Sequence, residues 1–222
     1  MKKILGIVAT LVFGSMAALS AKTWTNVSGF GWNIPMELSF SSNEFNNGEE
    51  VVLKCQTGLE GFYMGIHSSG FAVKGACDIN YSGINHEMDN TPYLGINLNM
   101  QLGAGYAPFH SEKFTLGVFG MVGIDISSFY CESTSYDSLA NKNITSKYTE
   151  GFAGYLIGGN ITAVYTPVSC FSVFASCSVN YVTPGEYLRK AEFSDVYANS
   201  ENVYSTNGTV KVIPTIGVSW KF

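Results

Sequence analysis

The sequence predicts an all-β protein, an eight-stranded antiparallel transmembrane β-barrel with up-and-down topology. Three observations lead to this prediction. Eight segments alternate between apolar and polar residues with the period of two that a β-strand requires. Nearly all charged residues of these segments fall on the polar row. Short connections alternate with long ones along the chain, as in barrels that cross a bacterial outer membrane.

The last predicted strand, 208–222, shows the alternation most clearly. One of its two rows is apolar from end to end: Val210, Val212, Pro214, Ile216, Val218, Trp220 and Phe222. The opposite row is polar or small, with Ile213 as the exception. A strand with one wholly apolar face and a terminal aromatic residue is typical of the strand that closes a membrane barrel against lipid.

Seven earlier segments repeat this pattern. They are predicted as strands at about 28–41, 58–68, 71–81, 92–106, 113–127, 151–166 and 170–181. The even residues form the lipid-facing row in 92–106, and the odd residues form it in 151–166. In the second segment we expect Phe62, Met64 and Ile66 to face lipid.

The charges of these segments are confined to one face. Only Glu60 falls on a predicted lipid-facing row. The opposite rows hold Glu37, Lys74, Asp78, Asp125, Lys211 and Lys221. A Lys or Arg exposed to lipid at the middle of a bilayer costs about 2–4 kcal/mol, which explains the segregation. A soluble lipocalin-like barrel would place its charges outside instead.

The predicted connections have two lengths. Three are short (69–70, 107–112 and 167–169) and four are long (42–57, 82–91, 128–150 and 182–207). We therefore expect the short turns and both termini on the periplasmic side and the long loops outside the cell. The long loops hold 5 basic and 12 acidic residues, so this outer surface is expected to be acidic and to favour cations or basic protein patches.

Aromatic residues gather near the predicted strand ends, as in the two girdles of a membrane barrel. Phe30, Trp32 and Trp220 are placed toward the periplasmic rim, whereas Tyr81 and Tyr155 are placed toward the outer rim.

The beginning of the chain predicts export. Residues 1–21 combine Lys2 and Lys3 with a short apolar run and small residues, which is typical of a cleaved signal peptide. The barrel domain is then 22–222, and no later run is long and apolar enough for a membrane helix. Without the two lysines, 10 basic and 17 acidic residues remain. This balance argues against a nucleic-acid partner.

The alternating end of the chain carries a resemblance. Ile216, Val218, Trp220 and Phe222 match the C-terminal insertion signal of small eight-stranded outer-membrane barrels, the group around OmpX, Ail, OmpW and the OmpA membrane domain. The chain is also similar in style to spirochaetal, treponemal barrels of unassigned function. The resemblance implies a bacterial outer-membrane location, a lipid-embedded wall and recognition of the last strand by the barrel-assembly machinery.

The inward charges predict a polar network in the lumen, formed by Glu37, Lys74, Asp78, Asp125 and Lys211. An eight-stranded barrel has an interior just wide enough for side chains to fill. The alternative is a narrow polar path or a small ligand cavity, because the inward rows also carry many glycines. Inward Phe119, Met121, Tyr63 and Phe174 are expected to take up that volume.

The cysteines and histidines suggest only weak sites. Cys55 and Cys131 fall in two long loops on the oxidising side, so a disulfide between them is one alternative. His86 lies in a long loop beside Glu87 and Asp89, but a single loop gives no rigid frame for catalysis. We expect no catalytic residue, no metal site and no cofactor.

The leading functional hypothesis is a non-enzymatic surface barrel whose acidic loops contact the environment or a host and whose lumen is filled by side chains. An OmpW-like channel for small, apolar solutes is the alternative. A lipid-modifying enzyme centred on His86 is a third.

Overall fold

The computed structural model describes residues 23–43, 48–85, 92–137, 142–169, 171–184, 186–193, 200–205 and 208–222. These residues form twelve strands: β1 Trp24–Asn33, β2 Met36–Asn43, β3 Gly48–Cys55, β4 Thr57–His67, β5 Phe71–Asn85, β6 Pro92–His110, β7 Phe114–Asp137, β8 Lys142–Val168, β9 Phe171–Val182, β10 Glu186–Phe193, β11 Ser200–Ser205 and β12 Thr209–Lys221. Within these ranges no helix has the length and apolar character needed to cross a membrane.

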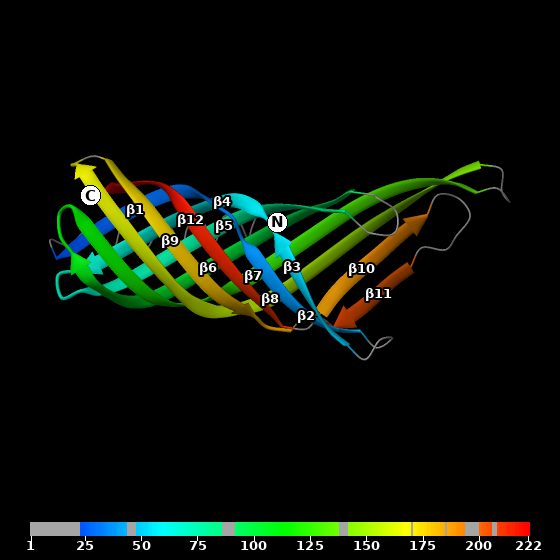
Figure 1. Ribbon diagram of the computed structural model, residues 1–222, viewed down its shortest axis with the longest axis horizontal. Coiled ribbons are helices and arrows are strands. Elements are labelled where there is room, and N and C mark those ends of the chain that lie inside the picture. The colour runs from blue at the N-terminus through cyan, green and yellow to red at the C-terminus, as the bar shows by residue number, and fades with distance from the viewer. Residues whose placement is uncertain are drawn as a thin grey trace.

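Eight of the strands close into a ring (Figure 1). Each pairs with its neighbours in the order β1-β4-β5-β6-β7-β8-β9-β12, and β12 pairs with β1 again. Every pairing is antiparallel, and the closing pair runs from Val27↔Lys221 to Asn33↔Thr215. The predicted fold class, an eight-stranded antiparallel transmembrane barrel, is confirmed.

The two ends of this barrel differ. At one end, called here the turn end, short turns join β4 to β5, β6 to β7 and β8 to β9, and β1 begins beside the end of β12. Gly70 closes the first of these turns with a φ of 88°, which a glycine adopts without steric cost. At the opposite end, the loop end, several strands continue past the ring.

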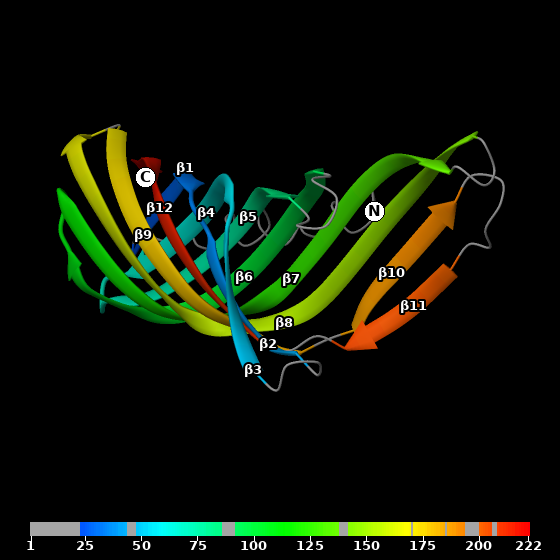
Figure 2. The same ribbon diagram turned by 45° about the vertical axis from the view of Figure 1, so that its right-hand side comes forward.

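Where the structure describes them, the long connections of the loop end are largely strands, so their prediction as loops was wrong there. The second half of the first predicted strand is a separate strand, β2, which pairs with β3 after a break at Ile34 and Pro35. β7 has 24 residues and β8 has 27, about twice the length of β9 and β12. Their far halves leave the ring, and the β10–β11 hairpin pairs with β8 there (Figure 2).

The outer wall of the ring is apolar. Large apolar side chains that project outward are exposed on every strand, among them Trp32, Leu59, Leu102, Val122, Tyr155, Ile157 and Ile216. The lipid-facing rows predicted for 92–106 and 151–166 are the exposed rows in β6 and β8. Such a wall is stable in contact with hydrocarbon because no charged side chain has to leave water.

The second strand is the exception, because its predicted orientation was inverted. Phe62, Met64 and Ile66 are 6%, 0% and 1% exposed and belong to the core inside the ring. Glu60, expected to face out, is buried on the same inward row. The row that faces out instead contains Leu59 and two glycines. Because this row is less apolar than the inward one, the prediction assigned the wrong row to lipid.

The lumen has two layers. Near the turn end it is filled by an apolar cluster: Val27, Phe62, Met64, Ile66, Ala72, Ala107, Phe119, Met121, Val164 and Phe174. Each large side chain in this cluster contributes about 1.5–3 kcal/mol by burial. Toward the loop end the inward side chains are polar or charged, and nearly all of them are buried.

The inward glycines do not open the free volume in the lumen that was considered as an alternative. A Cβ atom at Gly105 would clash with the carbonyl oxygen of Val118, and one at Gly123 would clash with that of Met100. These positions need glycine because neighbouring strands approach closely where a small barrel curves sharply. Phe119, Met121 and Phe174 lie in the lumen as expected, but Tyr63 does not.

Tyr63 lies on the outward row of β4, directly opposite Ser28. Its hydroxyl donates a hydrogen bond to Asn26 Oδ1 at 2.7 Å.

Candidate functional site

The candidate site is the polar layer of the lumen, which begins where the apolar cluster ends. One cross-strand row carries three of its four carboxylates: Glu60, Asp78, Asn99 and Asp125 are direct partners in register on β4, β5, β6 and β7. Because directly opposite residues of neighbouring strands have Cβ atoms about 4.5–5.5 Å apart, three carboxylates lie close together inside the ring.

Lys74 neutralises the first of these carboxylates. Its Nζ donates to Glu60 Oε1 at 3.2 Å, to Asn160 Oδ1 at 3.0 Å and to Thr162 Oγ1 at 2.9 Å. All three protons of the ammonium group are therefore used. The same Nζ lies 5.0 Å from the ring centroid of Phe62, at the boundary with the apolar cluster.

Glu60 connects opposite sides of the barrel. While Oε1 pairs with Lys74, Oε2 accepts hydrogen bonds from Ser176 Oγ on β9 and Thr215 Oγ1 on β12. One carboxylate thus joins four strands through side chains alone. This arrangement satisfies a buried charge that would otherwise cost several kcal/mol.

Lys211 neutralises the last carboxylate of the row. It forms a close ion pair with Asp125 and a longer one, 3.7 Å, with Glu37 Oε2. Asp125 Oδ1 also accepts hydrogen bonds from Asn97 Nδ2 at 2.9 Å and Ser127 Oγ at 3.3 Å. Glu37 lies nearest the loop end, and its side chain is 16% exposed.

Side-chain amides connect the charged groups. Asn97 donates to Asp125, and its Oδ1 then accepts from Asn80 Nδ2 at 3.2 Å and Asn99 Nδ2 at 2.9 Å. Asn80 and Asn99 therefore both direct their NH₂ groups toward Asn97. The Oδ1 oxygens of Asn80 and Asn99 have no hydrogen-bond partner in the described structure. The layer is therefore rich in acceptors and poor in donors.

All five lumen residues predicted from the sequence lie in this layer. The structure joins Asp125, Lys211 and Glu37 in one cluster and places Lys74 in another. Asp78 lies between the clusters and has no ion pair among the described residues. Glu60, the partner of Lys74, was not predicted as a lumen residue. Its position as the single charge on an apolar row was the signal that the orientation of that strand needed to be reversed.

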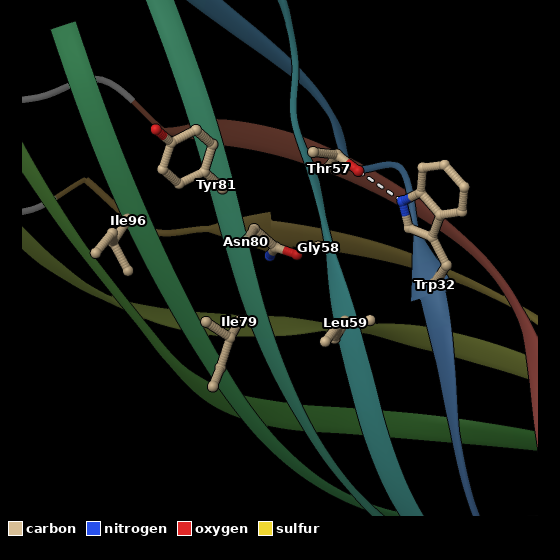
Figure 3. A pocket seen from close by; sticks show the side chains of 8 residues that line it. All are labelled: Trp32, Thr57, Gly58, Leu59, Ile79, Asn80, Tyr81 and Ile96. Atoms are coloured by element: carbon tan, nitrogen blue, oxygen red, sulfur yellow. Dashed lines mark hydrogen bonds between the residues drawn. The ribbon is translucent and has the colours of Figure 1, made fainter.

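Two hollows lie on the outer wall. One of about 570 Å³ is bordered by Trp32, Leu59, Ile79, Tyr81 and Ile96 near the loop end (Figure 3). Trp32 therefore borders the same hollow as Tyr81 and does not lie in the opposite girdle as predicted. Its indole Nε1 donates to Thr57 Oγ1. A second hollow of about 860 Å³ lies between Cys77, Met100, Val122 and Tyr155.

A second candidate surface projects from the loop end. The far halves of β7 and β8 form a sheet with β10 and β11, in the order β7-β8-β10-β11. The pairing of β7 with β6 ends at Tyr130, so residues 131–137 have a strand partner on one side only among the described strands. Exposed Glu132 and Lys147 form a 3.8 Å ion pair across this hairpin.

The proposed insertion residues lie on the closing strand. Ile216, Trp220 and Phe222 are 69%, 43% and 63% exposed on the outer wall. The ring of Trp220 stacks on Phe30 of β1 at a centroid distance of 5.9 Å. Phe222 exchanges two backbone hydrogen bonds of 2.9 Å with Asn26.

The remaining predicted sites are largely outside the described part of the chain. Cys55 is exposed and has a free thiol, whereas the side chain of Cys131 is not described, so a bridge between them stays a prediction. His86, Glu87 and Asp89 lie outside the described residues. Within the described ranges, no group of three or more His, Cys, Asp or Glu residues could hold a metal ion.

Neither a protein-family model nor a curated protein sequence matches this chain. Among solved structures, a major outer membrane protein from Thermus thermophilus is similar to it with a TM-score of 0.52 and 12% identity, over 87% of this chain and 99% of that one. Because the identity is so low, this likeness shows the fold alone.

Two further structures are similar at lower scores. Ail, the attachment invasion locus protein of Yersinia pestis, has a TM-score of 0.46 and 12% identity, over 91% of this chain and 100% of that one. Neisserial surface protein A has a TM-score of 0.41 and 14% identity, over 88% and 99% of the two chains.

Proposed function

We propose that this protein is a non-enzymatic surface barrel of a bacterial outer membrane, and that its projecting sheet is the interaction surface. The observation that carries the proposal is the sheet itself. The chain extends β7 and β8 to about twice the length of β9 and β12 and adds β10 and β11 beside them. Crossing the membrane does not require these extensions.

Among the described strands, residues 131–137 are paired on one side only, and this edge supports a binding role. An edge strand presents unpaired N–H and C=O groups, to which a strand of another protein can add. With short turns and both termini in the periplasm, the sheet would stand outside the cell. The acidic excess of the long loops would favour a host or environmental partner with a basic surface.

Shortening the hairpin tests this proposal. Residues 131–148 would be replaced by Asn-Gly between Tyr130 and Thr149, which are direct partners in register. We expect bacteria that display the shortened protein to adhere several-fold less to a reconstituted basement-membrane layer than bacteria that display the full chain. Heat-modifiable gel migration would show that both barrels are folded. Equal adherence at equal surface density would contradict the proposal.

A channel for small solutes is the second candidate, and the polar layer of the lumen near the loop end favours it. The apolar cluster near the turn end argues against conduction. Its side chains Phe62, Met64, Phe119 and Met121 are all at most 6% exposed, so they fill the lumen there. We therefore expect the purified protein to give no reproducible openings in planar bilayers. Stable unitary conductance from the pure protein would favour the channel instead.

A further inference from the structure

Among the described residues, one buried carboxylate of the polar layer, Asp78, forms no ion pair. Asp78 is 2% exposed, and its direct neighbours in the row are Glu60 on one side and Asn99 on the other. The two lysines of the layer pair with other acids, Lys74 with Glu60 and Lys211 with Asp125. Glu37 shares Lys211 with Asp125, but its side chain is 16% exposed at the loop end. The five buried residues alone therefore leave one negative charge, and it belongs to Asp78.

The hydrogen bonds of Asp78 are few and neutral. Its Oδ1 accepts from Asn33 Nδ2 at 3.2 Å, and its Oδ2 accepts from Gln101 Nε2 at 3.3 Å. A carboxylate offers about four acceptor positions, so roughly half of its capacity is used. Two long bonds from amides do not repay the removal of a charge from water.

Unpartnered oxygens around Asp78 form an independent observation. Asn33 and Asn99 are both 0% exposed, and the Oδ1 atom of each has no hydrogen-bond partner in the described structure. The amide of Asn33 contacts Asp78 through its nitrogen, so this side chain is a direct neighbour of the carboxylate. Asn99 is the direct register partner of Asp78. The orientation of both amides is set by the acceptors to which their NH₂ groups donate.

We propose that Asp78, Asn33 and Asn99 bind one monovalent hard cation, of the sodium or potassium class, inside the lumen. A carboxylate and amide carbonyl oxygens are the ligands that hard cations prefer. One unpaired negative charge matches one positive charge. A divalent ion would leave an excess of charge in a medium of low dielectric constant, where unpaired charge is costly. The cation would supply the charge that the two lysines do not.

The test is a comparison of salts during folding. Because the site is enclosed, the protein would be refolded into lipid vesicles in sodium chloride, potassium chloride or choline chloride of equal ionic strength at neutral pH. We expect the unfolding temperature in the better inorganic salt to exceed that in choline by about 5 °C. Calcium chloride should give no further rise. Equal unfolding temperatures in all three monovalent salts would overturn the proposal and leave a proton or water as the partner of Asp78.

Two variants and one direct measurement locate the effect. Asp78→Asn keeps the shape but removes the charge, so its unfolding temperature should not depend on the cation. Ser219→Ala removes a different buried, unpartnered oxygen and should keep the dependence. Crystals grown in thallium(I) acetate should show an anomalous density peak beside Asp78. If Asp78→Asn does not fold, this peak and the wild-type salt series decide, and an absent peak or a peak elsewhere in the barrel overturns the proposal.

Discussion

Glu60 is the residue that unites the two layers of the lumen. It pairs with Lys74, accepts hydrogen bonds from Ser176 and Thr215, and precedes Phe62 on the inward row of β4. Glu60 therefore indicates which face of β4 points inward and also neutralises the buried ammonium group of Lys74. Its chemistry follows from its surroundings, because a carboxylate inside a barrel must have partners and one in lipid cannot find them.

Removing one member of this ion pair should be more costly than removing both. We expect Glu60→Gln to lower the free energy of unfolding by about 3–5 kcal/mol, because Lys74 is left buried without its counter-ion. The double variant Glu60→Met, Lys74→Met should regain most of that loss. Urea unfolding of the protein in lipid vesicles measures both effects.

The exposed pair of the projecting hairpin is the matched control. The side chains of Glu132 and Lys147 are about half exposed, so Glu132→Gln should change the free energy of unfolding by less than about 1 kcal/mol. If Glu60→Gln were as mild as this control, the lumen network would not be the stabilising element described above.

The position of charged residues predicts which row of a barrel strand faces the lumen better than the size of its apolar side chains does. On β4 the large apolar residues occupy the inward row because the lumen near the turn end is itself apolar. A rule that assigns the bulkier row to lipid therefore fails on this strand and succeeds on β6 and β8, whose inward rows carry asparagine and threonine. Applied first, the position of Glu60 would have given the correct face.

The strands of the loop end could not be recognised from alternation. Segments such as 142–150 and 186–193 carry polar or charged residues on both faces, so no apolar row repeats every second residue. They are strands because they continue the backbone pairing of barrel strands below them, as β10 does along β8. The polar layer was more predictable, since five of its six charges lie on rows that were predicted to face inward. The partner of each charge was not, because pairing depends on the shear of the barrel.

At the scale of the whole molecule, closure depends on β12. This strand pairs with β9 on one side and β1 on the other, and its last residues make contacts at the turn end. Lys221 Nζ donates to the backbone oxygens of Ser111 and Glu112, 2.7 and 3.3 Å away. Phe222 and Trp220 contact β1. The end of the chain thus joins three parts of the barrel that are distant in sequence.

Deleting Trp220 to Phe222 should therefore impair assembly. The deletion removes the stacking of Trp220 on Phe30, the backbone pair between Phe222 and Asn26, and the bonds of Lys221 to the β6–β7 turn. The β12–β1 edge is then partly open, and an open edge in lipid leaves backbone groups without partners. We expect several-fold less protease-resistant protein in the outer membrane, measured by fractionation and heat-modifiable migration. Lys221→Ala, which removes the turn contact but keeps the strand and its aromatic residues, should stay near the parental level. If the deletion variant instead reached that level and resisted protease as the parent does, the end of β12 would be dispensable for both closure and insertion.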